Sequence, residues 1–172
     1  MRVPADKRRD QKMRCKERSG MRGSVRPRRF AGLVDAENAL IVRGCLLPAA
    51  EGDALLTVVG KYLGGMPVQV ATGEHVLRPY MASFATRGWV PALVPTEPDA
   101  ADLALLDAGR AFTAAGVTDI VLVSGDHIFT ELAGAARLHV IAHADHLSKA
   151  LRLAATTVTY LPRPAAPARA VV

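Results

Sequence analysis

Residues 119–129 read D-I-V-L-V-S-G-D-H-I-F and decide the fold. The apolar run at 120–123 is rich in β-branched residues and is followed by Ser124 and Gly125, which predicts a short strand buried on both faces. From His127 onward the chain can begin a helix, so Asp126 falls between the end of a strand and the start of a helix. Ligands bind at this edge in open parallel α/β sheets. Asp126 is therefore either a helix cap or a site residue.

The length and composition suit one domain of ordinary size. The chain has 172 residues, of which 50% are hydrophobic, enough for a sizeable core. No apolar run reaches the ~18–20 residues of a membrane span, and the basic N-terminus is not followed by the apolar stretch of a signal peptide. We therefore expect a cytoplasmic protein with no membrane association. Cys15 and Cys45 are too few for a disulfide framework or a zinc cluster and are expected to be reduced thiols.

The positive charge is concentrated in the first 29 residues. The whole chain carries +6, and residues 1–29 hold twelve Lys and Arg against three acids, a net charge of +9 that leaves −3 for the rest. With few large apolar side chains, residues 1–29 are predicted to be a disordered basic arm. The domain follows at 30–161, and 162–172 is a Pro/Ala-rich tail. The arm either attracts RNA, or is a solubilising tail, or results from a misassigned start upstream of Met13 or Met21.

Predicted strands and helices alternate through the domain. We predict strands at 30–34, 67–71, 89–94, 120–123, 138–142 and 156–161. We predict helices at 53–63, 76–86, 100–115 and 145–154, capped by Asp53 and Asp99 in two cases and with Pro79 in a first turn, and one short helix with a loop at 39–50. This alternation indicates an α/β fold with a largely parallel sheet. Right-handed crossovers then place every strand-to-helix loop on one edge.

Three aspartates fall at such strand-to-helix junctions. Asp35 ends the first strand, Asp102 lies in the first turn of the helix at 100–115, and Asp126 follows the strand at 120–123. Carboxylates that converge on one edge repel each other, so the arrangement needs a cation, a raised pKa or separation. Mg²⁺ and Mn²⁺ prefer carboxylate oxygens and, when held by a few of them, suit phosphodiester chemistry.

The segments that carry these acids resemble NYN domains, which belong to the PIN-like nucleases. V-D-A-E-N at 34–38 is similar to the opening D-x-x-N, A-D-L-A-L-L at 101–106 resembles the second acidic station at a helix start, and V-S-G-D at 123–126 resembles S-G-D-x-D. The resemblance covers about residues 30–161. It implies a Rossmann-like three-layer α/β/α sandwich with a mostly parallel central sheet. It also implies metal-dependent endoribonuclease activity on single-stranded or structured RNA, leaving 5′-phosphate and 3′-hydroxyl ends.

The resemblance also implies roles for individual residues. Asp35, Asp102 and Asp126 become the catalytic acids that bind Mg²⁺ or Mn²⁺. Asn38 orients a ligand or the substrate, and Ser124 supports the site. The sequence does not define the oligomeric state, so a homo-oligomer remains an open alternative.

One position departs from the family pattern. Ile128 stands where the family commonly carries a second acid, which removes one metal ligand. Asp107 lies too far beyond Asp102 to replace it, and Glu37 is a better candidate. His127 has two interpretations. It either binds phosphate or shuttles a proton, or it is a residue at a helix start that faces solvent. The missing acid keeps a second hypothesis open, a non-catalytic RNA-binding or protein-interaction module on the same fold.

The remaining histidines and cations leave similar alternatives. His75 lies on an edge loop and is either a substrate contact or a surface residue, whereas His139, inside a strand, is expected to be partly buried with its hydrogen bonds satisfied. We expect His143 and His146 at the surface. A third hypothesis, another nucleotide-handling α/β protein, lacks support because neither G-x-x-x-x-G-K-[ST] nor G-x-G-x-x-G occurs. Cations that either contact phosphates or lie on solvated helix faces are Arg78, Lys149 and Arg152.

Overall fold

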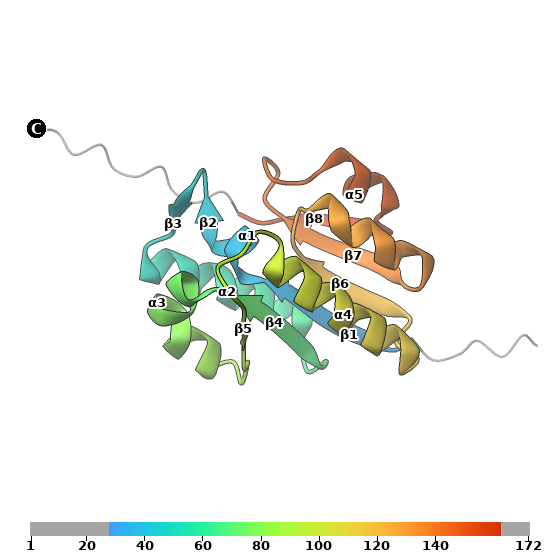
Figure 1. Cartoon of the computed structure of the whole chain (residues 1–172), viewed down its shortest axis with the longest axis horizontal. Helices are drawn as coiled ribbons and strands as arrows, with labels where there is room; N and C mark the ends of the chain where they lie inside the picture. Colours follow the sequence, from blue (N-terminus) through green and yellow to red (C-terminus); the bar gives the residue numbers. More distant parts are fainter. Residues whose placement is uncertain (1–27, 163–172) are drawn as a thin grey trace, which may run out of the picture.

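Six parallel strands form one central sheet in the computed structural model, which describes residues 28–162 (Figure 1). The strand order is β5-β4-β1-β6-β7-β8, and every neighbouring pair is parallel. The predicted α/β fold with a largely parallel sheet is thus confirmed. The strands are β1 (Phe30–Asp35), β4 (Val68–Thr72), β5 (Ala92–Leu93), β6 (Asp119–Val123), β7 (Arg137–Ala142) and β8 (Thr157–Tyr160).

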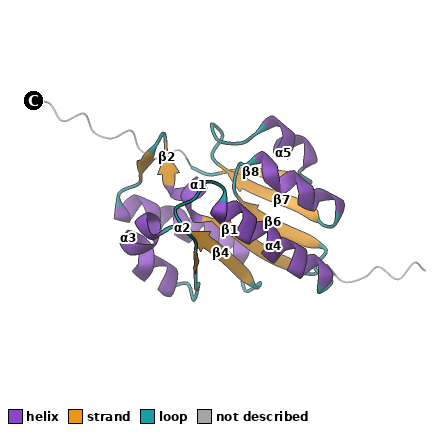
Figure 2. Cartoon of the chain, viewed as in Figure 1, coloured by secondary structure: helices purple, strands orange, loops and turns teal. Residues whose placement is uncertain are grey.

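Helices cover both faces of this sheet (Figure 2). Side chains of a strand alternate between the faces, so Val34 and Val121 pack with α2 (Ala49–Leu63) and α3 (Glu74–Ala85). Leu33 and Leu122 pack on the opposite side with α4 (Ala100–Ala114), the 3₁₀ helix η1 (His127–Gly134) and α5 (Lys149–Ala154). Two apolar clusters separated by the sheet make the three layers.

The central strand β6 is buried along its whole length, as its apolar run predicts. It lies between β1 and β7, and its register pairs Val34 with Val123. Asp35 and Ser124, the next residue of each chain segment, are therefore neighbours at the carboxyl edge of the sheet. The register of two central strands is what brings the first and last acidic segments together.

Three helix starts differ from the sequence prediction. Helix α2 begins at Ala49, so Asp53 is an interior residue, and its Oδ1 lies 2.9 Å from Nη1 of Arg87. Helix α3 begins at Glu74, which puts Pro79 inside the helix instead of in its first turn. Helix α5 begins at Lys149 and not at residue 145, because the Ser148 hydroxyl accepts the Leu151 N–H and caps it.

Residues 39–50 contain a hairpin that the sequence did not indicate. After α1 (Ala36–Leu40), the two-residue strands β2 (Ile41–Val42) and β3 (Cys45–Leu46) pair antiparallel. Arg43 and Gly44 between them have φ values of 53° and 76°, the left-handed conformation that a tight hairpin turn requires at both positions. Because arginine rarely adopts this conformation, the local sequence favoured a loop.

Several predictions fall outside the described part of the chain. The arm and tail lie there except for residues 28, 29 and 162, as do Cys15, Met13 and Met21. Cys45 is an exposed free thiol. Within residues 28–162, no helix combines the length and apolar character needed to cross a membrane.

Candidate functional site

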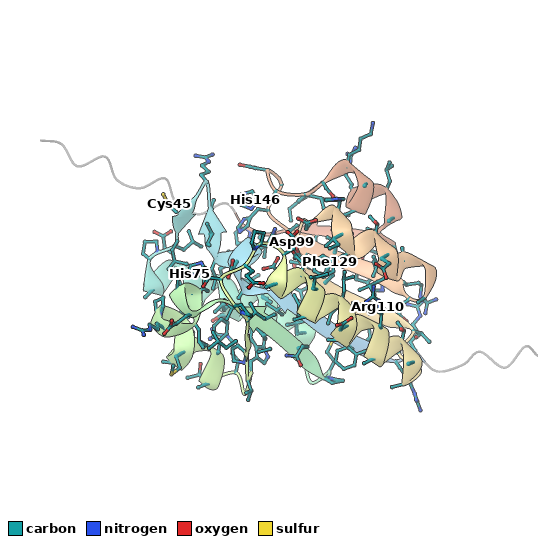
Figure 3. All side chains as sticks on the ribbon, in the orientation of Figure 1. Cys45, His75, Asp99, Arg110, Phe129 and His146 are labelled. Carbon is teal, nitrogen blue, oxygen red and sulfur yellow. The ribbon has the colours of Figure 1, made fainter. Side chains whose placement is uncertain are left out.

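A cavity of about 410 Å³ lies at the carboxyl edge of the sheet, and all three predicted acids line it. Asp35 reaches it from the end of β1, Asp102 from the first turn of α4, and Asp126 from the segment after β6. Figure 3 shows His75 and Asp99, two further lining residues, at the starts of α3 and α4 on this edge. Other polar residues of the wall are Glu37, Asn38, Thr96 and Glu97.

Asp35 is the most buried acid of the cavity, with 5% of its surface exposed. Its Oδ1 accepts the Asn38 N–H at 3.0 Å, and its Oδ2 accepts the Ser124 hydroxyl at 3.1 Å. Burial raises the pKa of Asp35 to about 6, although these hydrogen bonds oppose the rise. Ser124 therefore holds the acid in place.

Asp102 is half-buried and shows that the acids interact electrostatically. Its pKa is raised to about 7, first by burial and then by the negative charges of Asp35 and Asp126, with smaller contributions from Asp99 and Glu37. Carboxylates disfavour each other's ionisation when they share poorly solvated surroundings. Asp102 is therefore close enough to Asp35 and Asp126 for their charges to affect its ionisation.

Asp126 caps a helix, as one of the two alternatives for this position predicts, and its side chain also lines the cavity. Its Oδ1 accepts the Ile128 N–H at 2.9 Å and caps η1, while its own N–H donates to the Ser124 hydroxyl at 3.2 Å. The same side chain lines the cavity. Ser124 consequently contacts two of the three acids.

Asn38 connects the first acidic segment to the last. Its Oδ1 accepts the Gly125 N–H at 3.0 Å, which ties α1 to the turn after β6. A Cβ at Gly125 would lie 2.3 Å from the His146 carbonyl oxygen, so this turn has no room for a side chain. Asn38 lines the cavity, but its side-chain amide oxygen already accepts the hydrogen bond from the Gly125 N–H.

His127 and Ile128 lie outside the cavity lining. The His127 side chain is 77% exposed, with Nδ1 3.0 Å from Oδ1 of Asp126, so the solvent-facing alternative describes it. Ile128 is half-buried and packs against the apolar cluster beneath α4 and η1. The Ile128 side chain therefore contributes to the apolar core. Asp107 points elsewhere as well, to Arg110 at 2.7 Å.

The loop before α4 adds two acids that were not predicted to belong to the site. Glu97 and Asp99 line the cavity beside Asp102. Asp99 occupies the cap position of α4, as predicted, but its side chain makes no capping hydrogen bond and its φ is 61°. The available signal was the position of this acidic loop between a strand and a helix, which places it at the same edge.

For two further histidines, one prediction is confirmed and the other is wrong. His139 is confirmed as partly buried and satisfied, since its ring nitrogens contact Thr157 at 2.9 Å and Asp119 at 3.0 Å. His143 was expected at the surface but is 4% exposed, because the end of β7 lies against α1 and Nε2 of His143 bonds to the Ala39 carbonyl at 2.8 Å.

The cationic side chains singled out in the sequence lie elsewhere. Arg78 pairs with Glu74 of its own helix at 2.6 Å, and Lys149 and Arg152 are exposed on α5. None of the three is among the residues that line the cavity.

The donor set fits a hard divalent cation in its chemistry. Six carboxylates line the cavity, and a positive charge would offset the burial and the neighbouring negative charges that raise the pKa of Asp102. As they stand, however, no three His, Cys, Asp or Glu side chains of residues 28–162 are grouped closely enough to hold a metal ion. Binding would therefore require Asp35, Asp102 and Asp126 to draw closer around the ion.

Comparisons with known proteins support the fold. No family model matches the chain, and no curated protein matches it. Among solved structures, it is similar to VPA0982 from Vibrio parahaemolyticus, described as a protein of unknown function. The TM-score is 0.57 at 15% sequence identity, and the match covers 81% of this chain and 96% of the other. At this identity, the similarity extends to the parallel α/β fold alone.

Proposed function

We propose that the protein is a metal-dependent endoribonuclease of the PIN-like, NYN type. The observation that carries the proposal is the convergence of Asp35, Asp102 and Asp126, from three separate strand-to-helix junctions, on one cavity. The raised pKa of Asp102 supports it, because a cluster of mutually repelling acids in a cavity is typical of functional sites.

Asp35, Asp102 and Asp126 are the residues that would hold Mg²⁺ or Mn²⁺. A bound divalent ion supplies a water of lowered pKa and neutralises charge on the scissile phosphate. The chain's own contribution is positioning: Ser124 donates to Asp35 and accepts from the Asp126 N–H, which fixes the spacing of two acids. Asn38 fixes the turn between them through the Gly125 N–H.

The substrate in this proposal is RNA, either single-stranded or structured. The basic segment at 1–29, with a net charge of +9, would gather a polyanion that the acidic cavity repels at long range. Hydrolysis would leave 5′-phosphate and 3′-hydroxyl ends, as the NYN resemblance implies.

A second candidate is a non-catalytic RNA-binding or protein-interaction module on the same fold. The packing of Ile128 against the core favours it, because the position of the family's additional acid contributes no ligand here. The present spacing of the acids among residues 28–162 favours it as well.

Cleavage of a labelled single-stranded RNA by the full-length chain distinguishes the two candidates. We expect cleavage in Mn²⁺, no cleavage after chelation, and a loss of at least about a hundredfold in Asp126→Asn. Asp107→Asn is the matched control, because Asp107 is exposed and outside the cavity. RNA binding without cleavage in Mn²⁺ or Mg²⁺ would favour the non-catalytic module.

A further inference from the structure

The cavity contains one histidine among its acids. Of the described residues, those that line it include six carboxylates and His75, but no lysine or arginine. A phosphodiester that enters is an anion and is repelled by these carboxylates. The side chains of the wall with an N–H or O–H to donate are His75, Asn38 and Thr96, and of these only the imidazole can also carry a positive charge.

Local structure holds His75 on the cavity wall. It is the second residue of α3, which follows directly on the end of β4 and the cap residue Gly73. Oε1 of Glu37 accepts the Gly73 N–H at 2.8 Å and lies 3.9 Å from Nε2 of His75. The imidazole remains half exposed, so a ligand in the cavity can reach it.

Gly73 leaves room for this arrangement. A Cβ at this position would lie 2.8 Å from Oε1 of Glu37 and 3.1 Å from Nδ1 of His75. The φ of Gly73 is −78°, which any residue adopts, so backbone conformation does not require glycine here. Glycine is favoured here because the Glu37 carboxylate and the His75 imidazole both lie where a side chain of residue 73 would be.

We propose that His75 binds the RNA phosphate in this cavity, with Glu37 and Gly73 as its positioning residues. The inference rests on the proposed ribonuclease function and adds the contact that keeps an anionic substrate among Asp35, Asp102 and Asp126. A ring N–H of His75 donates to a non-bridging phosphate oxygen, which offsets part of the repulsion from the carboxylates. This contact is made equally in the bound substrate and in the transition state. Its loss should therefore raise KM and leave kcat unchanged.

The test is steady-state cleavage of a labelled single-stranded RNA by the full-length chain in Mn²⁺. His75→Gln replaces the imidazole by an amide that cannot carry a positive charge and should raise KM about tenfold, with kcat changed less than about twofold. Mn²⁺ affinity should be unchanged. His146→Gln is the matched control, since this histidine is outside the cavity lining, and it should leave both constants unchanged.

Gly73→Ala provides an independent variant in which no functional group is lost. The new methyl group displaces the ends of two flexible side chains, Glu37 and His75, so the fold should be retained while KM rises by about threefold or more. If His75→Gln does not fold, the KM of Gly73→Ala still tests the proposed phosphate contact of His75. A wild-type KM in the folded variants would overturn the proposal.

Further outcomes separate this contact from the proposed catalysis. Weaker Mn²⁺ binding by His75→Gln would make the residue a metal ligand and overturn the phosphate contact. If the wild type binds RNA without cleaving it, reduced RNA affinity in His75→Gln supports the contact although the catalytic function has failed. Unchanged RNA affinity in that variant, or no RNA binding by the wild type, overturns it.

Discussion

Two buried aspartates at opposite ends of the sheet have opposite surroundings. Asp119, at the start of β6, is fully buried, and two N–H groups of Arg137 donate to it at 2.8 Å. His139 and the Thr118 hydroxyl contact it too, and this environment, led by Arg137, holds the pKa of Asp119 well below its usual range. Asp35, at the end of β1, has no such cation among residues 28–162, and burial raises its pKa to about 6.

The comparison contrasts a carboxylate that is paired with a guanidinium and a group of carboxylates that share one cavity. At the amino edge, the guanidinium of Arg137 neutralises the acid. At the carboxyl edge, Asp35 and Asp102 share a cavity with further acids, and both pKa values are raised. Acids gathered in this way repel each other, and the proposed cation site rests on this arrangement.

The largest expected effect is the fall in stability when Asp119, the acid paired with Arg137, is replaced. Asp119→Ala leaves Arg137 and His139 without their carboxylate and should reduce the free energy of unfolding at pH 7 by about 2–4 kcal/mol. Denaturant titration measures it. Asp107→Ala removes an exposed partner of Arg110 and should cost less than about 0.5 kcal/mol. Similar losses in both variants would mean that the buried pair of Asp119 and Arg137 stabilises the fold no more than the exposed pair of Asp107 and Arg110.

An intermediate effect is expected at the position of the missing family acid. Ile128→Asp puts a carboxylate against the apolar cluster under α4 and should cost about 1–3 kcal/mol, with no gain in Mn²⁺ affinity. Thermal unfolding and calorimetry measure the two quantities, and Ile128→Ala separates lost packing from added charge. A stable Ile128→Asp protein that binds Mn²⁺ more tightly would show that this position belongs to the metal site.

The smallest expected effect is a pH-dependent gain in stability. Because the folded-state pKa of Asp102 is raised to about 7, its contribution to stability is present near pH 4 and is lost as the pH rises through 7. Asp102→Asn should therefore stabilise the metal-free protein at pH 8 by about 1 kcal/mol after screening by water. At pH 4 it should have little effect.

Thermal unfolding in the presence of a chelator at both pH values measures this difference. One kcal/mol corresponds to a shift in Tm of about 2–4 °C for a chain of this size. The same shift at pH 4 and pH 8 would mean that Asp102 affects stability through packing and not through its charge.

The sequence predicted those features that depend on short apolar runs and chain order. The run at 120–123 identified β6, and the alternation of elements placed Asp35, Asp102 and Asp126 at one edge. The positive φ values of Arg43 and Asp99 were not predicted, because residues other than glycine adopt this conformation uncommonly. Glu37 contacts Gly73 and His75, which lie 36 and 38 positions further along the chain, and no local pattern marks these contacts.

Calorimetric titration of the full-length chain with Mn²⁺ tests the central claim, that the three acids share one cation site. We expect the wild type to bind with a Kd on the order of micromolar, and Asp126→Asn and Asp102→Asn to bind at least about tenfold more weakly. Asp107→Asn should match the wild type, because its side chain is exposed on α4 beside Arg110. Equal affinities for the wild type and Asp126→Asn would contradict the shared site.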